Sequence, residues 1–428
     1  MFNNVEDYFS YFDEKTYLKL LRNEKNIDLF KIDKSFIPQI QLNLSNRVTT
    51  NYFQWRGQFS PELVEALLSK YANRESIILD PFVGCGTTLF ESVYQSLTCF
   101  GVDVNPSACE LSRTAKFANV PIPERLEIIK KAEEILLANC PDQLSWVKTK
   151  KTKKILEDDI VEEYFKIIFD ESEKYGEYTR NYIYNVIMRY NAIKKREIKN
   201  KLFYAFNSHK SIILRNLPYI NNEVNVFNND ARKISLDNST IDLIITSPPY
   251  INVFNYHQYY REVIELYRND ILKIAKSEIG SNRKNRENRF FTVIQYCLDM
   301  YHCFNEMKRL LKPKGKIFIV IGKESKIMNI KYNNSKILIT LAVLCSNLKL
   351  VNKQKRQFIT RFGQEITEDI LQFQIENKRT DIVDPREVGK YYLFRSLISA
   401  DVFKRKKIAE AIEKADEINQ SPLMLGQT

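Results

Sequence analysis

A glycine-bearing turn between a short apolar strand and a helix constrains the fold of this chain more than any other feature. Residues 76–80 are apolar and end in Asp80, residues 81–88 form the turn, and residues 89–96 have the composition of a helix. A second apolar segment at 98–104 follows, and then a helix that begins at Pro106. Strands that alternate with helices in this way predict βαβ units and a parallel sheet.

The same signature of a buried strand returns later in the chain, at residues 223–227, 241–246 and 316–321. Residues 348–361 and 369–375 are expected to close the sheet as an antiparallel pair. The charged, helical-looking residues 120–222 interrupt the alternation. We therefore predict an α/β fold with an inserted, mostly helical region.

The glycine turn has features that suit a bound cofactor. Gly84 and Gly86, two of only 11 glycines in the chain, lie in it one residue apart. Glycine lets bare backbone approach a ligand closely, and the following helix offers free N–H groups at its N-terminus. Asp103 ends the second strand, about 20 residues on, where an acidic side chain can bind ribose hydroxyls. The turn has neither the third glycine of a dinucleotide fingerprint nor the lysine of a phosphate loop, and a purely structural turn is the alternative interpretation.

A second motif, Ser247-Pro248-Pro249-Tyr250, directly follows the apolar strand at 241–246. Two prolines cannot continue a central strand, so the chain must leave the sheet at the carboxyl end of this strand, where open α/β sheets bind ligands. Backbone carbonyls and the Ser247 hydroxyl can accept hydrogen bonds from a planar amine, and the Tyr250 ring can stack on it. An ordinary proline turn with a buried tyrosine is the alternative.

Together these motifs resemble those of the amino-methyltransferases of DNA, which use S-adenosylmethionine. The family's cofactor motif, DPFxGxGTT, matches residues 80–88 in full, and its catalytic motif, [DNS]PP[YF], matches residues 247–250. Residues 59–62, 229–231 and 311–316 are similar to shorter motifs of the family. The resemblance covers the sheet-forming half of the chain and implies a Rossmann-like class I methyltransferase sheet.

The resemblance also implies a role for each matching residue. The implied cofactor-binding residues are Phe59, Glu62, Asp80, Pro81, Phe82, Gly84, Gly86, Thr87, Thr88, Asp103 and Asp230. Among them, Asp103 would bind the ribose and Asp230 the adenine amino group. The implied catalytic residues are Ser247, Pro248, Pro249 and Tyr250. Ser247 and the Pro248 carbonyl would orient the target amine, and Tyr250 would stack on the target base.

The implied chemistry needs little from the protein beyond positioning, because the sulfonium of the cofactor is already an activated electrophile. The exocyclic amine of a base is a poor nucleophile, since its lone pair is delocalised into the ring. Two acceptors on its hydrogens localise that lone pair, and the base must first be flipped out of the duplex. Carbon-5 methylation of cytosine would instead need a nucleophilic cysteine, and the only Cys-Pro pair, Cys140-Pro141, lies far from both motifs.

The sequence constrains the identity of the target base less than it constrains the reaction. A serine at the first position of the catalytic motif is more similar to the cytosine-N4 group of the family, and adenine N6 is the alternative. An RNA enzyme that methylates tRNA guanine and an inactive nucleic-acid-binding module on the same fold are the other readings that we retain.

The chain is basic, with 65 Lys and Arg against 53 Asp and Glu and a formal net charge of +12. This balance favours an anionic partner, nucleic acid before a membrane surface. The excess is concentrated in residues 148–154, 194–201, 281–290 and 349–361. The candidate nucleic-acid-binding residues are Lys148, Lys150, Lys151, Lys153, Lys154, Arg283, Lys284 and Arg286. The alternative is that the inserted region is a packing domain whose charges are only solvated.

We expect four parts along the chain: an N-terminal extension (1–50), a catalytic domain (51–119 and 223–400), an inserted target-recognition region (120–222), and a C-terminal helix and tail (401–428). The expected partners are double-stranded DNA and a cognate restriction endonuclease or other defence protein. Seven irregularly spaced cysteines and three histidines predict neither a metal site nor a disulfide framework. With no signal peptide and no apolar run of about 18 residues, we expect a cytoplasmic protein and no membrane partner.

Overall fold

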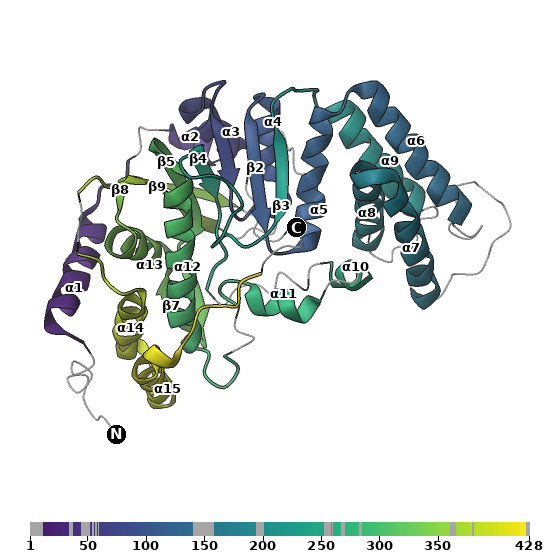
Figure 1. Cartoon of the computed structure of the whole chain (residues 1–428). Helices are drawn as coiled ribbons and strands as arrows, with labels where there is room; N and C mark the ends of the chain where they lie inside the picture. The colour runs from purple at the N-terminus through teal and green to yellow at the C-terminus, as the bar shows by residue number, and fades with distance from the viewer. Residues whose placement is uncertain are drawn as a thin grey trace.

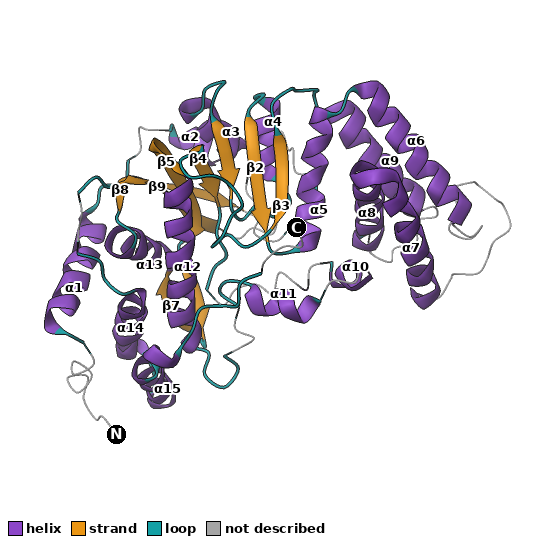
Figure 2. Ribbon diagram, viewed as in Figure 1, coloured by secondary structure: helices purple, strands orange, loops and turns teal. Residues whose placement is uncertain are grey.

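The structure is a computed structural model of the chain, in which a seven-stranded sheet lies between two layers of helices (Figures 1 and 2). The described residues are 12–33, 37–43, 52–53, 55, 58, 60–139, 158–193, 201–251, 258, 260–266, 270–281, 285–359, 365–378 and 381–424.

The strand order of the sheet is β3-β2-β1-β4-β5-β9-β8. Its strands are β1 (Ile77–Asp80), β2 (Thr98–Asp103), β3 (Val224–Asn228), β4 (Ile241–Thr246), β5 (Leu311–Gly322), β8 (Leu348–Ile359) and β9 (Glu365–Ile375). The first five strands in this order pair in parallel, and β9 and β8 add antiparallel to β5. The predicted α/β fold with a mostly parallel Rossmann-like sheet and a closing antiparallel pair is confirmed. A separate antiparallel pair consists of β6 (Glu324–Ile327) and β7 (Ile330–Asn333).

Successive residues of the strands face opposite layers, as the period of a β-strand requires. In β1, Ile78 belongs to the cluster formed with α3 (Pro61–Tyr71), α4 (Thr87–Tyr94) and α5 (Pro106–Arg113). Its neighbour Leu79 belongs to the cluster on the other face, beneath α12 (Phe291–Leu310). The helices that pack with α12 are α1 (Glu14–Leu29), α13 (Asn334–Thr340), α14 (Pro385–Ser396) and α15 (Val402–Glu413).

Between α5 and β3, the chain forms a group of helices at one end of the molecule (Figure 1). They are α6 (Ile122–Asn139), α7 (Asp158–Ser172), α8 (Gly176–Ala192) and α9 (Lys201–Ser211). Arg125 of α6 is 0% exposed and donates to five backbone carbonyls, those of Ala118, Val120, Ile213, Leu217 and Pro218. One guanidinium therefore ties the segment that enters this helical group to the segment that leaves it.

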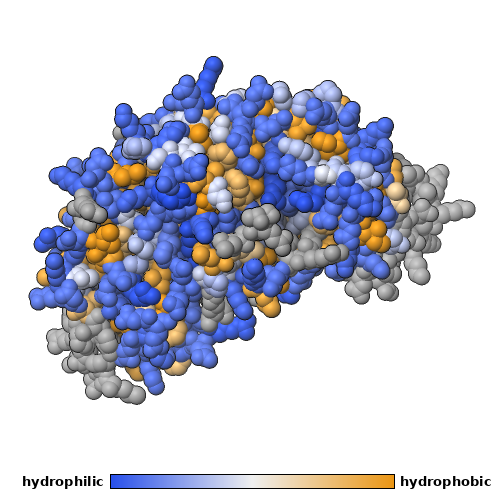
Figure 3. Space-filling view, viewed as in Figure 1, coloured by the Kyte–Doolittle hydropathy of each residue, from blue (hydrophilic) through white to orange (hydrophobic). Residues whose placement is uncertain are grey.

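The remaining described helices are α2 (Gln39–Asn43), α10 (Arg261–Leu266) and α11 (Ile271–Ser277), the last two of which follow the catalytic motif. The face of the molecule in Figure 3 is mainly hydrophilic, with small hydrophobic groups between polar ones. Among the described helices, we find none with the length and apolar character that a membrane span requires.

Some element ends differ from the prediction. The helix expected from residue 89 begins two residues earlier, at Thr87, because Gly86 adopts a left-handed conformation and ends the turn there. The helix after Pro106 is α-helical only as far as Arg113 and continues to Asn119 as a 3-10 turn. β5 begins at Leu311, five residues before the predicted start at residue 316.

Candidate functional site

The two motifs meet at the carboxyl ends of β1 and β4. The chain continues from β1 to β2 on one side, while β4 pairs with β1 on the other, so these strands flank the point where the strand order reverses. Ligands of open α/β sheets bind in the crevice at this position. A pocket with about 840 Å³ of empty space, partly open to solvent, lies here.

Residues of both motifs line this pocket. The predicted site residues among its lining are Asp80, Pro81, Phe82, Gly84, Thr87, Asp103, Asp230, Ser247 and Pro249. The predicted residues that are described but are not among the lining are Glu62, Gly86, Thr88, Pro248 and Tyr250. Phe59 lies outside the described residues. The carboxyl edge of the sheet thus brings together most of what the two distant motifs predict.

Asp80 connects the two motifs through hydrogen bonds. It is 3% exposed, and its carboxylate accepts hydrogen bonds from the hydroxyls of Thr88 at 2.7 Å and Thr246 at 2.6 Å. Thr88 belongs to α4, and Thr246 ends β4 directly before the catalytic motif. Burial raises the pKa of Asp80 to about 6, although these hydrogen bonds oppose the shift. The side chain therefore fixes the start of α4 to the end of β4.

The two glycines of the turn are both left-handed, with φ of +51° at Gly84 and +93° at Gly86. A Cβ on Gly86 would lie 2.9 Å from the Cα of Ser112 in α5, and a Cβ on Gly84 would lie 3.0 Å from the indole of Trp55. A side chain at either position would be strained by the backbone conformation and crowded by these neighbours. The turn therefore needs glycine at both places.

Asp103 faces the turn from the end of β2. Its carboxylate accepts the backbone N–H of Gly84 at 3.1 Å and that of Asn105 at 2.8 Å. Burial raises the pKa of Asp103 to about 7; the charges of Glu278 and Asp80 add to this shift, and the two N–H groups oppose it. A carboxylate held at the pocket wall with this pKa is an acceptor that suits hydroxyl groups.

The catalytic motif is held by hydrogen bonds from two other elements, β5 and α12. The Tyr250 hydroxyl accepts the N–H of Gly322 at 2.9 Å, and the Pro249 carbonyl accepts the Tyr296 hydroxyl of α12 at 3.1 Å. Burial raises the pKa of Tyr250, which its hydrogen bonds with Gly322 and Ser247 oppose. A Cβ on Gly322 would lie 3.0 Å from the Tyr250 ring, so the end of β5 packs directly against it.

Sequence reasoning missed several lining residues. Those with polar or aromatic side chains are Trp55, Gln58, Asn105, Ser277 and Glu278. Ser277 ends α11, and Glu278 and Ile279 follow it along the pocket wall. The next residue, Gly280, has φ of +75° and approaches Tyr250 so closely that a Cβ would lie 2.5 Å from the Tyr250 carbonyl oxygen. The isolated Gly280 after an amphipathic helix was the available signal for this close approach. Nothing in the spacing pointed to Trp55.

Asp230 is 1% exposed and is engaged by the protein itself. One carboxylate oxygen accepts the backbone N–H and Nε of Arg232, at 3.0 and 2.8 Å. The other accepts Nη2 of Arg232 at 2.6 Å and the N–H of Met424 at 3.1 Å. Four donors of the protein thus orient this carboxylate, which offers about four lone-pair sites. The implied contact with the adenine amino group stays a prediction.

The pocket is acidic, although the whole chain is basic. Its described lining includes Asp80, Asp103, Asp230 and Glu278 and no lysine or arginine. S-adenosylmethionine carries a sulfonium, an ammonium and two ribose hydroxyls, which carboxylates and a glycine turn can accommodate. The residues present therefore fit this cofactor. In the described part of the chain, no group of His, Cys, Asp and Glu could hold a metal ion.

The cysteines that the structure describes are all buried, and only Cys85 lines the pocket. Cys85 lies within the turn and is buried, and burial raises the pKa of its thiol to about 12. A thiol with that pKa is protonated at neutral pH and is a poor nucleophile. Cys140 lies outside the described residues.

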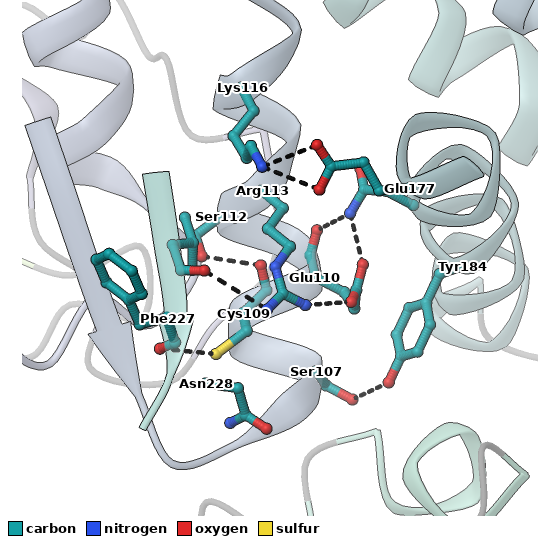
Figure 4. A network of polar contacts seen from close by, with 12 residues as sticks. Ser107, Cys109, Glu110, Ser112, Arg113, Lys116, Glu177, Tyr184, Phe227 and Asn228 are labelled. Carbon is teal, nitrogen blue, oxygen red and sulfur yellow. Dashed lines mark hydrogen bonds and ion pairs between the residues drawn. The ribbon is translucent and has the colours of Figure 1, made fainter. Parts of the chain in front are cut away.

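Polar contacts attach the helical group to the helix that follows Asp103 (Figure 4). The Asn181 amide of α8 donates to the backbone carbonyl of Glu110 at 2.8 Å and to its carboxylate at 2.7 Å. Lys116 and Glu177 form an ion pair at 3.0 Å, and the hydroxyls of Ser107 and Tyr184 lie 3.1 Å apart (Figure 4). The helical group is therefore joined to the cofactor side of the sheet by the buried contacts of Asn181 and Tyr184 and by one exposed ion pair.

Of the predicted nucleic-acid-binding residues, the structure describes one, Arg286, which is exposed. The others, Lys148, Lys150, Lys151, Lys153, Lys154, Arg283 and Lys284, lie outside the described residues.

Comparison with known proteins agrees with the motifs. The family model of the N6/N4 methyltransferases, described as DNA methylase, matches residues 4–114 and 241–423. The Type II methyltransferase M.MjaII of Methanocaldococcus jannaschii is 25% identical over an alignment of 397 positions, and the match covers 64% of this chain and 72% of that protein.

Solved structures with a similar arrangement include an S-adenosylmethionine-dependent methyltransferase from Methanosarcina mazei. It has 11% identity and a TM-score of 0.33, and the match covers 73% of this chain and 98% of that one. The PH0226 protein of Pyrococcus horikoshii has 13% identity and a TM-score of 0.31, with coverage of 77% and 97%.

Proposed function

Since this chain belongs to the N6/N4 DNA methylase family, we propose that it transfers a methyl group from S-adenosylmethionine to the N4 amine of a cytosine within a specific DNA site. Family membership makes the chain a DNA methyltransferase with this donor; the base and the site specificity are our proposal. The observation that carries the proposed transfer is that Asp103 and Ser247 line one and the same acidic pocket.

On the cofactor side, the residues of the turn bind and orient S-adenosylmethionine, which supplies an activated methyl group when bound. Asp103 accepts the ribose hydroxyls, while Gly84 and Gly86 let the backbone of the turn come close. Phe59, Glu62 and Thr87 hold the methionine end in this proposal. Thr88 acts through Asp80, to which it donates at 2.7 Å, and so keeps the turn in place.

On the target side, Ser247 and the Pro248 carbonyl accept the two hydrogens of the amine and localise its lone pair. The Pro249 carbonyl already accepts the Tyr296 hydroxyl, so it positions the motif instead. Tyr250 presents its ring to the flipped base and is itself held by Gly322. None of these steps requires a strong base at the site.

The serine that opens the catalytic motif favours cytosine over adenine. To test this, duplex DNA is incubated with the protein and labelled cofactor, digested to nucleosides and separated by mass. We expect N4-methylcytosine. N6-methyladenine would overturn the base assignment alone. In a parallel incubation, label in RNA but not in DNA would overturn the choice of DNA as the substrate. Absence of cofactor binding would favour an inactive module.

We further propose that residues 120–222 read the DNA sequence within a catalytic domain of residues 51–119 and 223–400, flanked by the extension at 1–50 and the tail at 401–428. The buried hydrogen bonds from Asn181 of α8 to Glu110 of α5 support this, because a region that reads the DNA sequence must be held at a fixed distance from the pocket. Exchange of the insertion with that of a related enzyme should transfer site specificity. An unchanged methylation site would refute the assignment.

The similar protein from Methanocaldococcus jannaschii is named a Type II methyltransferase, which supports a role in a restriction–modification system. We propose that Arg286 and the basic segments at 148–154 and 283–284 contact DNA phosphates in the cytoplasm, and that a cognate endonuclease cuts the same site. DNA from cells that express the protein should resist one restriction specificity. Unaltered sensitivity at the methylated site would contradict this role.

A further inference from the structure

The C-terminal segment returns to the pocket after the chain has left it. In Figure 1, this yellow segment runs from the α15 end of the molecule past α12 towards its centre. Ser421 is 2% exposed, and the segment up to Met424 contacts two walls of the cofactor pocket. No catalytic or cofactor motif covers these residues.

The first wall is reached through a buried charge cluster. Arg232, Asp230 and Asp299 have side chains that are 1%, 1% and 0% exposed. Arg232 donates to both oxygens of Asp230 and, through Nη1 at 2.6 Å, to Asp299. Burial alone would lower the pKa of Arg232, but the hydrogen bonds to Asp230 and the charges of both carboxylates raise it, so the guanidinium stays charged.

The C-terminal segment completes this cluster. Arg232 uses its last two donors on the carbonyls of Ser421, at 2.7 Å, and Pro422, at 2.9 Å. Asp299 accepts the backbone N–H and the hydroxyl of Ser421, at 2.8 and 2.7 Å. The N–H of Met424 then bonds to Asp230 itself at 3.1 Å. All five guanidinium donors are thereby satisfied, as a buried charge requires.

The second wall is reached through the Met424 side chain. It packs against the small apolar cluster of Ile264, Ile271 and Ile274 in α10 and α11. The sulfur lies 3.7 Å from the hydroxyl of Ser277, which begins the pocket-lining segment 277–279. One short segment therefore joins Asp230 on one side of the pocket to Ser277 and Glu278 on the other.

We propose that residues 421–424 form a strap that holds the cofactor pocket in its binding shape, and that Arg232 is the positioning residue that couples this strap to Asp230. Asp230 lines the pocket, and its carboxylate is held in place by the strap and by Arg232. Loss of the strap leaves two donors of Arg232 without their acceptors and removes two donors from Asp299 and one from Asp230. The wall then relaxes and binds the cofactor less well.

The test compares two truncated chains by titration with S-adenosylmethionine. Removal of residues 421–428 should weaken binding by at least about tenfold, because several buried hydrogen bonds to charged groups are lost. Removal of residues 425–428 alone leaves every described contact of the strap intact and should bind like the full chain. At saturating cofactor and DNA, kcat should stay within about twofold of the full chain, since the strap does not touch Ser247 or Tyr250.

A pair of full-length variants tests the strap independently, in case the shorter chain misfolds. Met424→Pro removes the N–H that bonds to Asp230, whereas Met424→Ala keeps it; both substitutions remove the thioether that contacts Ser277. The Kd of the proline variant should exceed that of the alanine variant by about fivefold, at equal KM for DNA.

Two results would overturn the proposal. One is a Kd for the shorter chain equal to that of the full chain; the other is a lowered Tm with unchanged Kd in Met424→Pro, which would make the segment a structural tail only. The proposal rests on the cofactor assignment, and the two are separable. Failure of the full chain to bind S-adenosylmethionine would refute that assignment, whereas equal binding by all variants refutes only the strap.

Discussion

The pH dependence of cofactor affinity tests Asp103 as the ribose ligand. Burial raises the pKa of this carboxyl to about 7, and the charges of Glu278 and Asp80 contribute to the shift. The protonated carboxyl is a weaker acceptor for hydroxyls and attracts a cationic ligand less. We therefore expect S-adenosylmethionine to bind the deprotonated form of the pocket.

The size of the effect follows from the pKa. With a value of about 7, about nine-tenths of the molecules are deprotonated at pH 8 and about one-tenth at pH 6. The apparent Kd is the intrinsic Kd divided by the competent fraction, so it should rise about tenfold between these pH values. This rise corresponds to about 1.4 kcal/mol of binding free energy.

Isothermal titration at pH 6, 7 and 8 and constant ionic strength measures this slope, with Asp103→Asn as the matched control. The variant should bind more weakly but without the tenfold dependence, because an amide does not titrate. Burial raises the pKa of Asp80 to about 6, so protonation of Asp80 would account for a smaller rise of the Kd at the acidic end in this variant. A flat Kd in the unmodified protein, or an equal slope in the variant, would refute the reasoning.

The same pKa shift has the opposite effect on the free protein. The ordinary pKa of Asp103 is 3.8, and its value in the fold is about 7. A group with a raised pKa contributes stability that is fully present below the ordinary value and is lost as the pH rises through the raised one. The free protein should lose stability between pH 4 and 7, and saturating cofactor should raise the Tm more at pH 8 than at pH 6.

Four substitutions test other parts of the structure. Ser247→Ala and Tyr250→Ala should each lower kcat for methyl transfer at least a hundredfold with the cofactor Kd unchanged. The first removes an acceptor from the amine, and the second removes the surface on which the base stacks. Full activity of both variants would exclude the proposed mechanism. Gly86→Ala should lower the Tm by several degrees and weaken the cofactor, since its φ is +93° and its Cβ would lie 2.9 Å from Ser112; a Tm equal to that of the parent would argue against the strain. Arg125→Met should destabilise the protein by about 3 kcal/mol or more in denaturant unfolding, because buried carbonyls lose their donor, and a loss below about 1 kcal/mol would mean that water replaces the guanidinium.

The parts of the site that sequence predicted are local in the chain. A strand, a tight turn and a helix are adjacent in residues 76–96, so apolar runs and glycines specify them directly. The same holds for the strand that ends in Thr246 and the prolines that follow it. Because parallel strands of one sheet end at the same edge, two local predictions were enough to bring Asp103 and Ser247 into one pocket.

The parts that sequence missed depend on contacts between distant residues. Met424 bonds to Asp230 across 194 residues, and Asn181 bonds to Glu110 across 71. No periodicity or motif links such pairs, because their proximity is decided by how whole helices pack. Glu278 is similar: its place in the pocket depends on the close approach of Gly280 to Tyr250, which only the folded backbone reveals.

The net charge of +12 pointed to nucleic acid, but the pocket itself carries the opposite sign. These two facts are consistent if DNA binds around the pocket and only a base enters it. Phosphates are repelled by the carboxylates of Asp80, Asp103 and Glu278, whereas an extruded base is neutral and meets no such barrier. The positively charged donor is attracted by the same groups. One acidic pocket in a basic protein thus admits both reactants of the proposed transfer and keeps the DNA backbone outside.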